Sequence, residues 1–549
     1  MPAIWYDDFV DNRTAEQIGL AWIWQRFQTL SCYGDHLRRR LRPYGPGQER
    51  QLQEEWALVR RTLEDCQQKP SLVKAVEMDI HQLREIRGLV GKSARGMALE
   101  EFELFEFKQW LSRVASLAQK LNLLTNLPPR LELLDFSTLA ALLSVGEQSE
   151  QGFYLSDQYL PELAELRARQ RKLQSRLNRL RRRAQAAISA ETGVEFNFMG
   201  VVRVSKLEGK LLEELRQRDD LILAAEGFTD VEFRLRESGL MLTISGELAE
   251  LETGIQQEEL AVRLRLSKEV ARYQRQLLAV CRRLGSIDLL FAKIRLARET
   301  GWTEPILSKD NHIELRGFTH PAIANYLQHQ GLEFQPVDID LSTKVTLITG
   351  ANMGGKSVSL KSAGLAVAMA QLGLLVPADK LVFSLRGFVY YSQQDASPEQ
   401  GLSTFGAEVY SLAGILPRYQ ERGLMLLDEP ARGTNPAEGT AIVGALVDWL
   451  RTGNSLVVVS THYQPRVAGD VNLFQVAGLA ALTPAELNAA LKENKSVQEL
   501  MDYSLVPGSG QVPRDALKVA AFLGLDKEII DSAARELGVE LQEVTNFET

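Results

Sequence analysis

Cysteine is scarce in this sequence, and long apolar runs are missing from it. The three cysteines, Cys32, Cys66 and Cys281, are far apart in the chain and show no C-x-x-C spacing. This excludes a disulfide framework and gives no sign of a zinc site. No apolar run approaches the roughly 18 residues that a membrane-spanning helix needs, and residues 1–10 carry acids where a secretory signal carries lysines. We therefore expect a cytoplasmic protein with no membrane segment.

Positive charge is also in deficit. The 549 residues carry a net charge of −8, with 45% hydrophobic and 24% charged residues. This composition is ordinary for globular domains, and the length suffices for three or four of them. A net negative charge argues against a protein that coats DNA over its whole surface, although it leaves a local basic patch possible.

A glycine-rich motif stands between an apolar stretch, residues 345–349, and a helix-like segment, residues 358–375. Its residues are Gly350, Ala351, Asn352, Met353, Gly354, Gly355, Lys356 and Ser357. The pattern G-x-x-x-x-G-K-S between a strand and a helix predicts a P-loop. In such a loop the backbone N–H groups surround the β-phosphate, Lys356 reaches the β- and γ-phosphates, and the Ser357 hydroxyl binds Mg²⁺.

Two further apolar stretches end in polar residues that suit the same site. Residues 424–427 are followed by Asp428 and Glu429, the form of a Walker B strand. Asp428 is predicted to hold Mg²⁺ through water, and Glu429 to polarise the attacking water. Residues 455–461 lead to His462, at the strand end where open α/β sheets present groups to ligands. We interpret His462 as a candidate γ-phosphate sensor.

These motifs, in this order and spacing, resemble the ATPase of the MutS family. The resemblance covers at least residues 315–535. Besides the P-loop and Asp428-Glu429, it rests on His320-Pro321, Ala370-Gln371-Leu372-Gly373, Ser403-Thr404-Phe405, Arg432-Gly433-Thr434, Thr461-His462-Tyr463 and the stretch 503–508. It implies ATP as the nucleotide, hydrolysis with Mg²⁺, and a homodimer or a heterodimer with a related chain. Ser403 of one chain would reach the γ-phosphate bound by its partner.

The adenine end of this site departs from the family pattern. Phe334-Gln335-Pro336-Val337 stands where the family has F-x-P-N, so Phe334 is expected to stack on adenine while Val337 replaces an amide. Near residues 471–475 no histidine is present to cover the other side of the base. We therefore expect loosened base selectivity.

The chain as a whole predicts a multidomain α and α/β protein. Residues 1–158 form a helical core that resembles the family's lever, and residues 159–285 a coiled-coil arm with a small β tip. A return helix and linker over 286–330 lead to a P-loop ATPase domain of the ABC type over 331–482. The last piece, 483–549, resembles the helices with which the family dimerises.

Two apolar seams at steps of three and four residues predict the antiparallel coiled coil of this arm. The first seam consists of Leu163, Leu166, Gln170, Leu173, Leu177, Leu180 and Ala184. The second consists of Leu266, Val270, Tyr273, Leu277, Val280 and Leu284. Between them, strict alternation predicts a hairpin that pairs residues 231–235 with 240–244 around a turn at Gly239.

A run of basic residues without acids lies on the first helix of the predicted arm, the one that carries the first seam. It comprises Arg167, Arg169, Arg171, Lys172, Arg176, Arg179, Arg181, Arg182 and Arg183. One interpretation is a solvated face of the coiled coil. The other is contact with the phosphates of duplex DNA, because unbalanced arginines on an arm suit sequence-independent binding. In the MutS family such an arm ends in a clamp that grips DNA.

Three functions remain open. The sequence has no room for the family's mismatch-reading domain before the helical core, and it ends without a nuclease-like tail, which favours a branch that has neither. The first hypothesis is a dimeric clamp whose nucleotide state sets its grip on DNA. The second is an ATPase that reactivates a protein client such as a cobalamin-dependent lysine 5,6-aminomutase, because Asn435-Pro436-Ala437-Glu438-Gly439 is reminiscent of such chains. A scaffold without catalysis is disfavoured, since Lys356, Ser357, Asp428 and Glu429 are all present.

Overall fold

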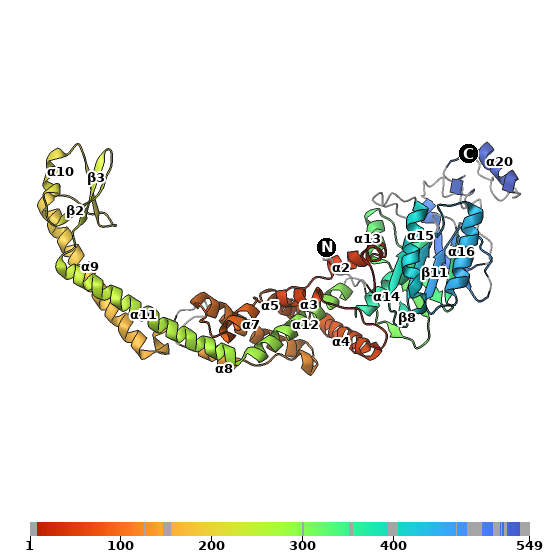
Figure 1. Cartoon of the computed structure of the whole chain (residues 1–549), viewed down its shortest axis with the longest axis horizontal. Helices are drawn as coiled ribbons and strands as arrows, with labels where there is room; N and C mark the ends of the chain where they lie inside the picture. The colour runs from red at the N-terminus through yellow and green to blue at the C-terminus, as the bar shows by residue number, and fades with distance from the viewer. Residues whose placement is uncertain are drawn as a thin grey trace. The chain divides into compact units, whose positions relative to one another are not determined.

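The structure is a computed structural model, and it divides into two compact units. It describes residues 8–125, 127–145, 155–298, 301–350, 355–392, 404–467, 469–479, 497–508, 517, 519–520 and 524–537. The first unit contains residues 1–82, 120–131 and 283–549, and the second contains residues 83–119 and 132–282. Figure 1 shows helices and strands in the first unit and, in the second, long helices that lead to a small sheet. An α and α/β architecture is thereby confirmed.

A six-stranded sheet forms the centre of the first unit. Its order is β13-β12-β7-β11-β10-β9, and every pairing is parallel except the one between β12 and β13. The strands are β7 (Val345–Thr349), β9 (Val389–Ser392), β10 (Leu424–Asp428), β11 (Leu456–Ser460), β12 (Asn472–Gly478) and β13 (Asp502–Pro507). All residues of β9, β10 and β11 are buried, which explains why these strands are continuous apolar runs rather than alternating ones.

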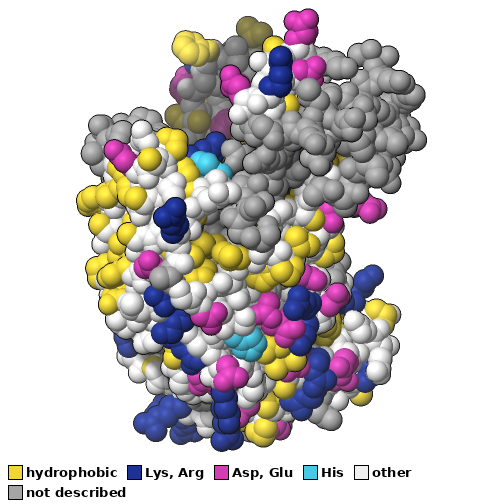
Figure 2. Space-filling model, turned by 90° about the vertical axis from the view of Figure 1, so that its right-hand side faces the viewer, with side chains coloured by type: hydrophobic (Ala, Val, Ile, Leu, Met, Phe, Trp, Pro, Cys, Tyr) yellow, Lys and Arg dark blue, Asp and Glu magenta, His cyan; other side chains and the backbone are white. Residues whose placement is uncertain are grey.

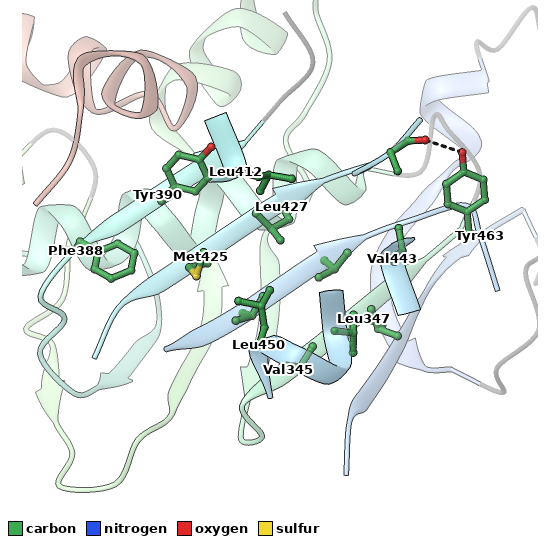
Figure 3. Packing of buried hydrophobic residues seen from close by; sticks show 14 residues of the cluster. Val345, Leu347, Phe388, Tyr390, Leu412, Met425, Leu427, Val443, Leu450 and Tyr463 are labelled. Atoms are coloured by element: carbon green, nitrogen blue, oxygen red, sulfur yellow. Dashed lines mark hydrogen bonds between the residues drawn. The ribbon is translucent and has the colours of Figure 1, made fainter. Parts of the chain in front are cut away.

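Helices cover both faces of this sheet. Helix α14 (Lys356–Gln371) packs on one face, where Gly364 lies beside the Leu426 side chain. On the other face, Met425 and Leu427 of β10 join a buried cluster to which α15 (Thr404–Ile415) and α16 (Pro436–Leu450) contribute (Figure 3). The alternation of β10 between the two helix layers fixes its register, so that Asp428 lies at the carboxyl edge of the sheet.

The remaining elements of the first unit surround this domain. A second sheet has the order β4-β8-β5-β6, with β4 (Ile306–Leu307), β5 (Ile313–Phe318), β6 (Val337–Leu341) and β8 (Lys380–Phe383). The helices are α1 (Asn12–Gln17), α2 (Leu20–Arg26), α3 (Cys32–Arg38), α4 (Glu49–Gln68), α5 (Pro70–His81), α13 (Pro321–His329), α18 (Val497–Leu500) and α20 (Lys527–Leu537), with 3₁₀ turns at Pro129–Leu131 and Leu416–Gln420.

The carboxyl end of the P-loop helix is fastened to the N-terminal helices. The Trp56 indole N–H of α4 donates to the Ala370 carbonyl at 3.2 Å. The Gln371 side-chain amide donates to the carbonyls of Tyr44 (2.7 Å) and Arg386 (2.9 Å). These contacts hold α14 at one end, while its other end carries Lys356.

The second unit contains the arm. Its helices are α6 (Arg87–Ala94), α8 (Ser137–Leu142), α9 (Pro161–Thr192), α10 (Gly209–Arg216) and α11 (Gly239–Arg272), together with a 3₁₀ turn at Asp157–Tyr159. Two helices, α7 (Glu101–Leu124) and α12 (Gln274–Arg298), have residues in both units. No helix of the described residues is long and apolar enough to cross a bilayer.

Helices α9 and α11 run side by side in the arm (Figure 1), but the partner of the first seam differs from the prediction. Leu177 of α9 packs with Met241 and Ile244, and the Gly254 position lies beside Leu166. The two helices are therefore antiparallel, as expected. However, the first seam meets the early part of α11 rather than residues 266–284, because α11 already begins at Gly239, well before the predicted second seam.

The predicted hairpin at the tip is wrong. β3 (Asp230–Leu235) pairs antiparallel with both β1 (Val201–Ser205) and β2 (Leu221–Glu226). Ser238 is instead the N-cap of α11, and its hydroxyl accepts the Met241 N–H. Residues 240–244 alternate between apolar and polar types, yet Met241 and Ile244 are buried at helical spacing. An N-cap serine followed by a helix outweighed the short strand pattern.

His320 predicts a loss of stability in acid. Its buried ring accepts the Ile323 N–H at Nδ1 and lies 3.2 Å from the Ile18 carbonyl through Nε2, which suits the neutral imidazole. Burial lowers its pKa to about 4, whereas an unfolded histidine titrates near 6.5. The unfolded chain therefore binds this proton more tightly. We expect up to about 3 kcal/mol of stability, complete above pH 6.5, to be lost as pH falls towards 4.

Urea unfolding at pH 7.5 and pH 5 measures this effect. His320→Asn keeps an N-cap acceptor without a titrating ring, so it should lose less stability than the wild type on acidification. An equal loss in both proteins would mean that other groups cause the acid sensitivity.

Candidate nucleotide site

The predicted motifs meet at the carboxyl edge of the six-stranded sheet. In the order β7-β11-β10, Gly350 follows the first strand, Ser460 ends the second and Asp428 ends the third. Asp428 and Ser460 are register partners. Ligands of open parallel sheets bind at this edge, outside the carboxyl ends of the strands. Motifs that are about 100 residues apart in sequence thus share one site.

Lys356 occupies the first position of α14 and is 3% exposed. Its ammonium donates to the Gly350 carbonyl at 2.7 Å and lies 3.5 Å from a carboxylate oxygen of Glu429. Burial lowers the Lys356 pKa, while Glu429 opposes that shift. Gly355 precedes it in the left-handed region, at φ 75°, and a side chain there would meet the Tyr503 ring. A helix N-terminus with a buried cation suits phosphate oxygens.

Asp428 is fixed by two hydroxyl donors. The Tyr391 hydroxyl donates to one carboxylate oxygen at 2.7 Å, and the Ser460 hydroxyl to the other at 2.5 Å. Ser357 lies at the start of α14 and lines the same cavity as Lys356. A hydroxyl and a carboxylate are the oxygen ligands that Mg²⁺ prefers when phosphates supply the rest of its shell. The described residues contain no group of three or more His, Cys, Asp or Glu side chains that could hold a metal ion by themselves.

Glu429 has an unusual backbone and two cationic neighbours. Its φ is 50°, and its N–H donates to the Ser460 hydroxyl at 3.0 Å. Its carboxylate lies 2.8 Å from Arg432 and 3.5 Å from Lys356. The carboxylate is thereby held beside the cation that marks the expected phosphate position, where a general base must stand.

His462 follows β11 and contacts Tyr463, with ring centroids 4.2 Å apart. Among the described residues nothing bonds its buried Nδ1. Burial lowers the pKa of His462, so its ring is neutral at neutral pH. A neutral imidazole can donate one hydrogen bond to a phosphate oxygen, as a sensor requires.

A cavity of about 730 Å³ joins the P-loop to the predicted adenine contact. Phe334, Val337, Ser357 and Glu429 all line it, and so does Tyr503 of β13. The sequence argument missed Tyr503 as an adenine contact because it looked for a histidine near 471–475, on the neighbouring strand. The antiparallel pairing of β12 with β13 brings the tyrosine there.

Gln335 joins the two sides of this cavity. Its side-chain amide donates to Asp502 at 2.8 Å, and its amide oxygen accepts the Tyr503 N–H at 2.9 Å. The Phe334 loop and β13 are therefore linked directly. Two aromatic side chains that line a cavity next to a P-loop suit a flat base.

Comparisons with known proteins agree with this geometry. The family model described as MutS domain V matches residues 346–542, which include Lys356, Asp428, Glu429 and His462. Over these residues the chain is similar to domain V of the MutS family.

Its similar relatives are proteins named Endonuclease MutS2. The one from Latilactobacillus sakei is 29% identical over 315 residues, which are 57% of this chain and 38% of that protein. The one from Levilactobacillus brevis is 32% identical over 282 residues, or 51% of this chain and 34% of that protein. The one from Staphylococcus epidermidis is 34% identical over 266 residues, or 48% and 32%. The aligned part of the chain spans about a third of the length of these relatives.

Some predicted residues cannot be placed. Ala351, Asn352, Met353 and Gly354 of the P-loop lie outside the described residues, and so does Ser403. Most of the predicted dimerisation region is also outside them. The roles of these residues stay predictions.

Proposed function

We propose that the chain is a MutS-like ATPase that works as a dimer, either a homodimer or a heterodimer with a related chain, and couples its nucleotide state to duplex DNA. The observation that carries the proposal is the convergence of Lys356, Asp428, Glu429 and His462 at one sheet edge, beside a cavity large enough for a nucleotide. The match of residues 346–542 to MutS domain V supports the same activity.

Each side chain has a role that its surroundings allow. Lys356 and the α14 N-terminus would hold the phosphates of ATP, with the bound Mg²⁺ on Ser357 and Asp428 supplying charge neutralisation. Glu429 would take a proton from the attacking water, and neutral His462 would donate to the γ-phosphate. Phe334 and Tyr503 would enclose the adenine. Ser403 would complete the partner's site.

Duplex DNA would contact the arm through a basic stripe on α9. In the described residues, Arg167, Arg169, Arg171 and Arg181 have acidic partners in ion pairs. No ion pair is found there for the exposed Lys172, Arg176, Arg179, Arg182 and Arg183. Steps of four, three and four residues place Lys172, Arg176, Arg179 and Arg183 on one face, roughly 17 Å long, about the length of five base pairs.

The tip of the arm is a poorer match for phosphates. Residues 193–238 contain seven Lys or Arg and ten Asp or Glu, a net charge of −3. Half of its exposed cations are paired: Arg203 with Glu232, and Lys206 and Arg216 with Glu226. Among the described residues of the first unit on the face in Figure 2, blue and magenta side chains are interspersed. The stripe on α9 is therefore the proposed contact.

The ATPase rate, measured with intact duplex, with mismatched duplex and without DNA, tests the proposal. We expect hydrolysis without DNA and a changed rate with either duplex, to a similar extent for both, since the stripe on α9 would contact phosphates, which are the same in both duplexes. Absence of hydrolysis under all three conditions would contradict the proposed activity. An ATPase rate that is the same with and without DNA would contradict the proposed coupling.

The alternative client, an aminomutase, gains no support from the comparisons, because the relatives reported above are named endonucleases. The same names give no support to the expectation of a branch distinct from nuclease-bearing relatives. We therefore retain the DNA-coupled function alone.

A further inference from the structure

The backbone after Asp428 adopts a rare conformation at two positions. Among the described residues, Glu429 (φ 50°) and Ala431 (φ 62°) are the non-glycine residues with positive φ, and they flank Pro430. L-residues with a Cβ seldom occupy the left-handed region, and they persist there when their surroundings hold them. Neither residue is an asparagine, an aspartate or a glycine, the types that tolerate it best. Other groups must therefore fix this turn.

Two buried side chains hold Ala431 from opposite sides. Its N–H donates to a carboxylate oxygen of Glu408 at 2.9 Å. Its carbonyl accepts the Tyr463 hydroxyl at 3.1 Å, the dashed contact in Figure 3. Ala431 is 3% exposed, Glu408 5% and Tyr463 6%. Water cannot readily replace either bond, and the bond to the carboxylate is charge-assisted.

These holding groups come from different parts of the fold. Glu408 lies on α15, and Tyr463 follows β11 directly after His462. Gly439 of α16 lies against the Tyr463 ring, and a Cβ at position 439 would come within 2.7 Å of that ring. The Ala431 peptide is thus fixed between α15 and the segment that follows β11.

The fixed peptide determines where the proposed base stands. Glu429 is two residues before Ala431, and Arg432, one residue after it, pairs with the Glu429 carboxylate at 2.8 Å. If the turn relaxed towards ordinary φ values, the side chains of Glu429 and Arg432 would both move. The carboxylate would then leave its place 3.5 Å from Lys356.

We propose that Glu408 is a positioning residue for hydrolysis: it holds Ala431 in the left-handed conformation and thereby keeps Glu429 directed at the site. This inference rests on the proposed ATPase function. Glu408 contacts the backbone of the turn rather than the expected phosphates. Its loss should therefore affect the chemical step more than nucleotide binding.

Steady-state ATPase kinetics and nucleotide titration of the full chain test the proposal. Glu408→Ala should lower kcat by about 10- to 100-fold and change nucleotide affinity by less than about threefold. Glu408→Gln keeps an acceptor oxygen and should remain within about fivefold of the wild-type kcat. Tyr463→Phe removes the second bond and should lower kcat selectively as well.

A second substitution separates positioning from general damage. Glycine occupies the left-handed region freely, so Ala431→Gly in the Glu408→Ala background should recover about five- to tenfold of the lost kcat. Leu412→Ala, also on α15, removes buried apolar contacts and should lower the unfolding temperature while kcat at 25 °C stays near wild type.

The outcomes are distinct. A kcat-selective loss with rescue by glycine supports the proposal. Wild-type kcat in Glu408→Ala, or a loss that Ala431→Gly does not relieve, overturns it even when the wild type hydrolyses ATP. A wild type without ATPase activity overturns the proposed function and this inference together. If Glu408→Ala does not fold, Tyr463→Phe with wild-type kcat would still overturn the proposal.

Discussion

Lys356→Ala should abolish tight ATP binding, whereas Glu429→Gln should bind ATP and fail to hydrolyse it. Lys356 is a buried cation at the amino end of α14, so its removal takes away the charge that faces the phosphates. Loss of a buried, paired charge weakens binding on the order of 100-fold or more. Glutamine at 429 keeps the shape of the side chain but cannot accept a proton, so kcat should fall by about 10²- to 10⁴-fold.

Nucleotide titration and single-turnover hydrolysis measure the two effects separately. Matched controls are Lys380→Ala and Glu421→Gln, which remove a lysine and a glutamate that pair at the surface, with Glu314 and Arg418 respectively. Both should leave binding and kcat near wild type, because exposed ion pairs contribute little. Equal nucleotide affinity in the wild type and Lys356→Ala would contradict the assignment of the P-loop, and undiminished turnover in Glu429→Gln would contradict the assigned base.

Neutralising the basic stripe on α9 should weaken duplex binding and flatten its salt dependence. Each lost phosphate contact removes about 0.9 from the slope of log K against log salt, so Lys172, Arg176, Arg179 and Arg183 together account for a change of about 3.6. Replacing all four with glutamine should therefore lower the affinity on the order of 100-fold or more at low salt. The four side chains lie outside the Leu173-Leu177-Leu180 seam, so folding and basal ATPase rate should remain.

The tip provides a control with the same change of charge. Arg203, Lys206, Arg216 and Arg218 are paired with acids, so their replacement by glutamine should alter the salt slope by less than about one. If the tip variant loses as much affinity as the stripe variant, the tip is part of the contact. Wild-type binding that is weak at ~150 mM salt, or that survives loss of the stripe, would contradict the DNA-coupled function.

Lys356, Asp428, Glu429 and His462 were found from sequence because their signal is local. Asp428, Glu429 and His462 end or follow buried parallel strands, and a continuous apolar run that leads to polar residues is visible in a single chain. The P-loop adds a second local constraint, since only glycine fits at Gly355, where Tyr503 closes in at positive φ. The two apolar seams of the arm, with steps of three and four residues, were visible because they too are local.

Tertiary structure decided what depends on pairing between distant segments. Tyr503 enters the nucleotide cavity because β13 pairs with β12, and Glu408 reaches Ala431 because α15 packs over β10. In the sequence, the nine basic residues of α9 cannot be told apart. In the structure, acids as distant as Glu247 and Glu259 form ion pairs with some of them. Periodicity predicts which face of a helix is buried. The partner of that face depends on long-range packing, and the free energy of packing comes from residues of distant segments together.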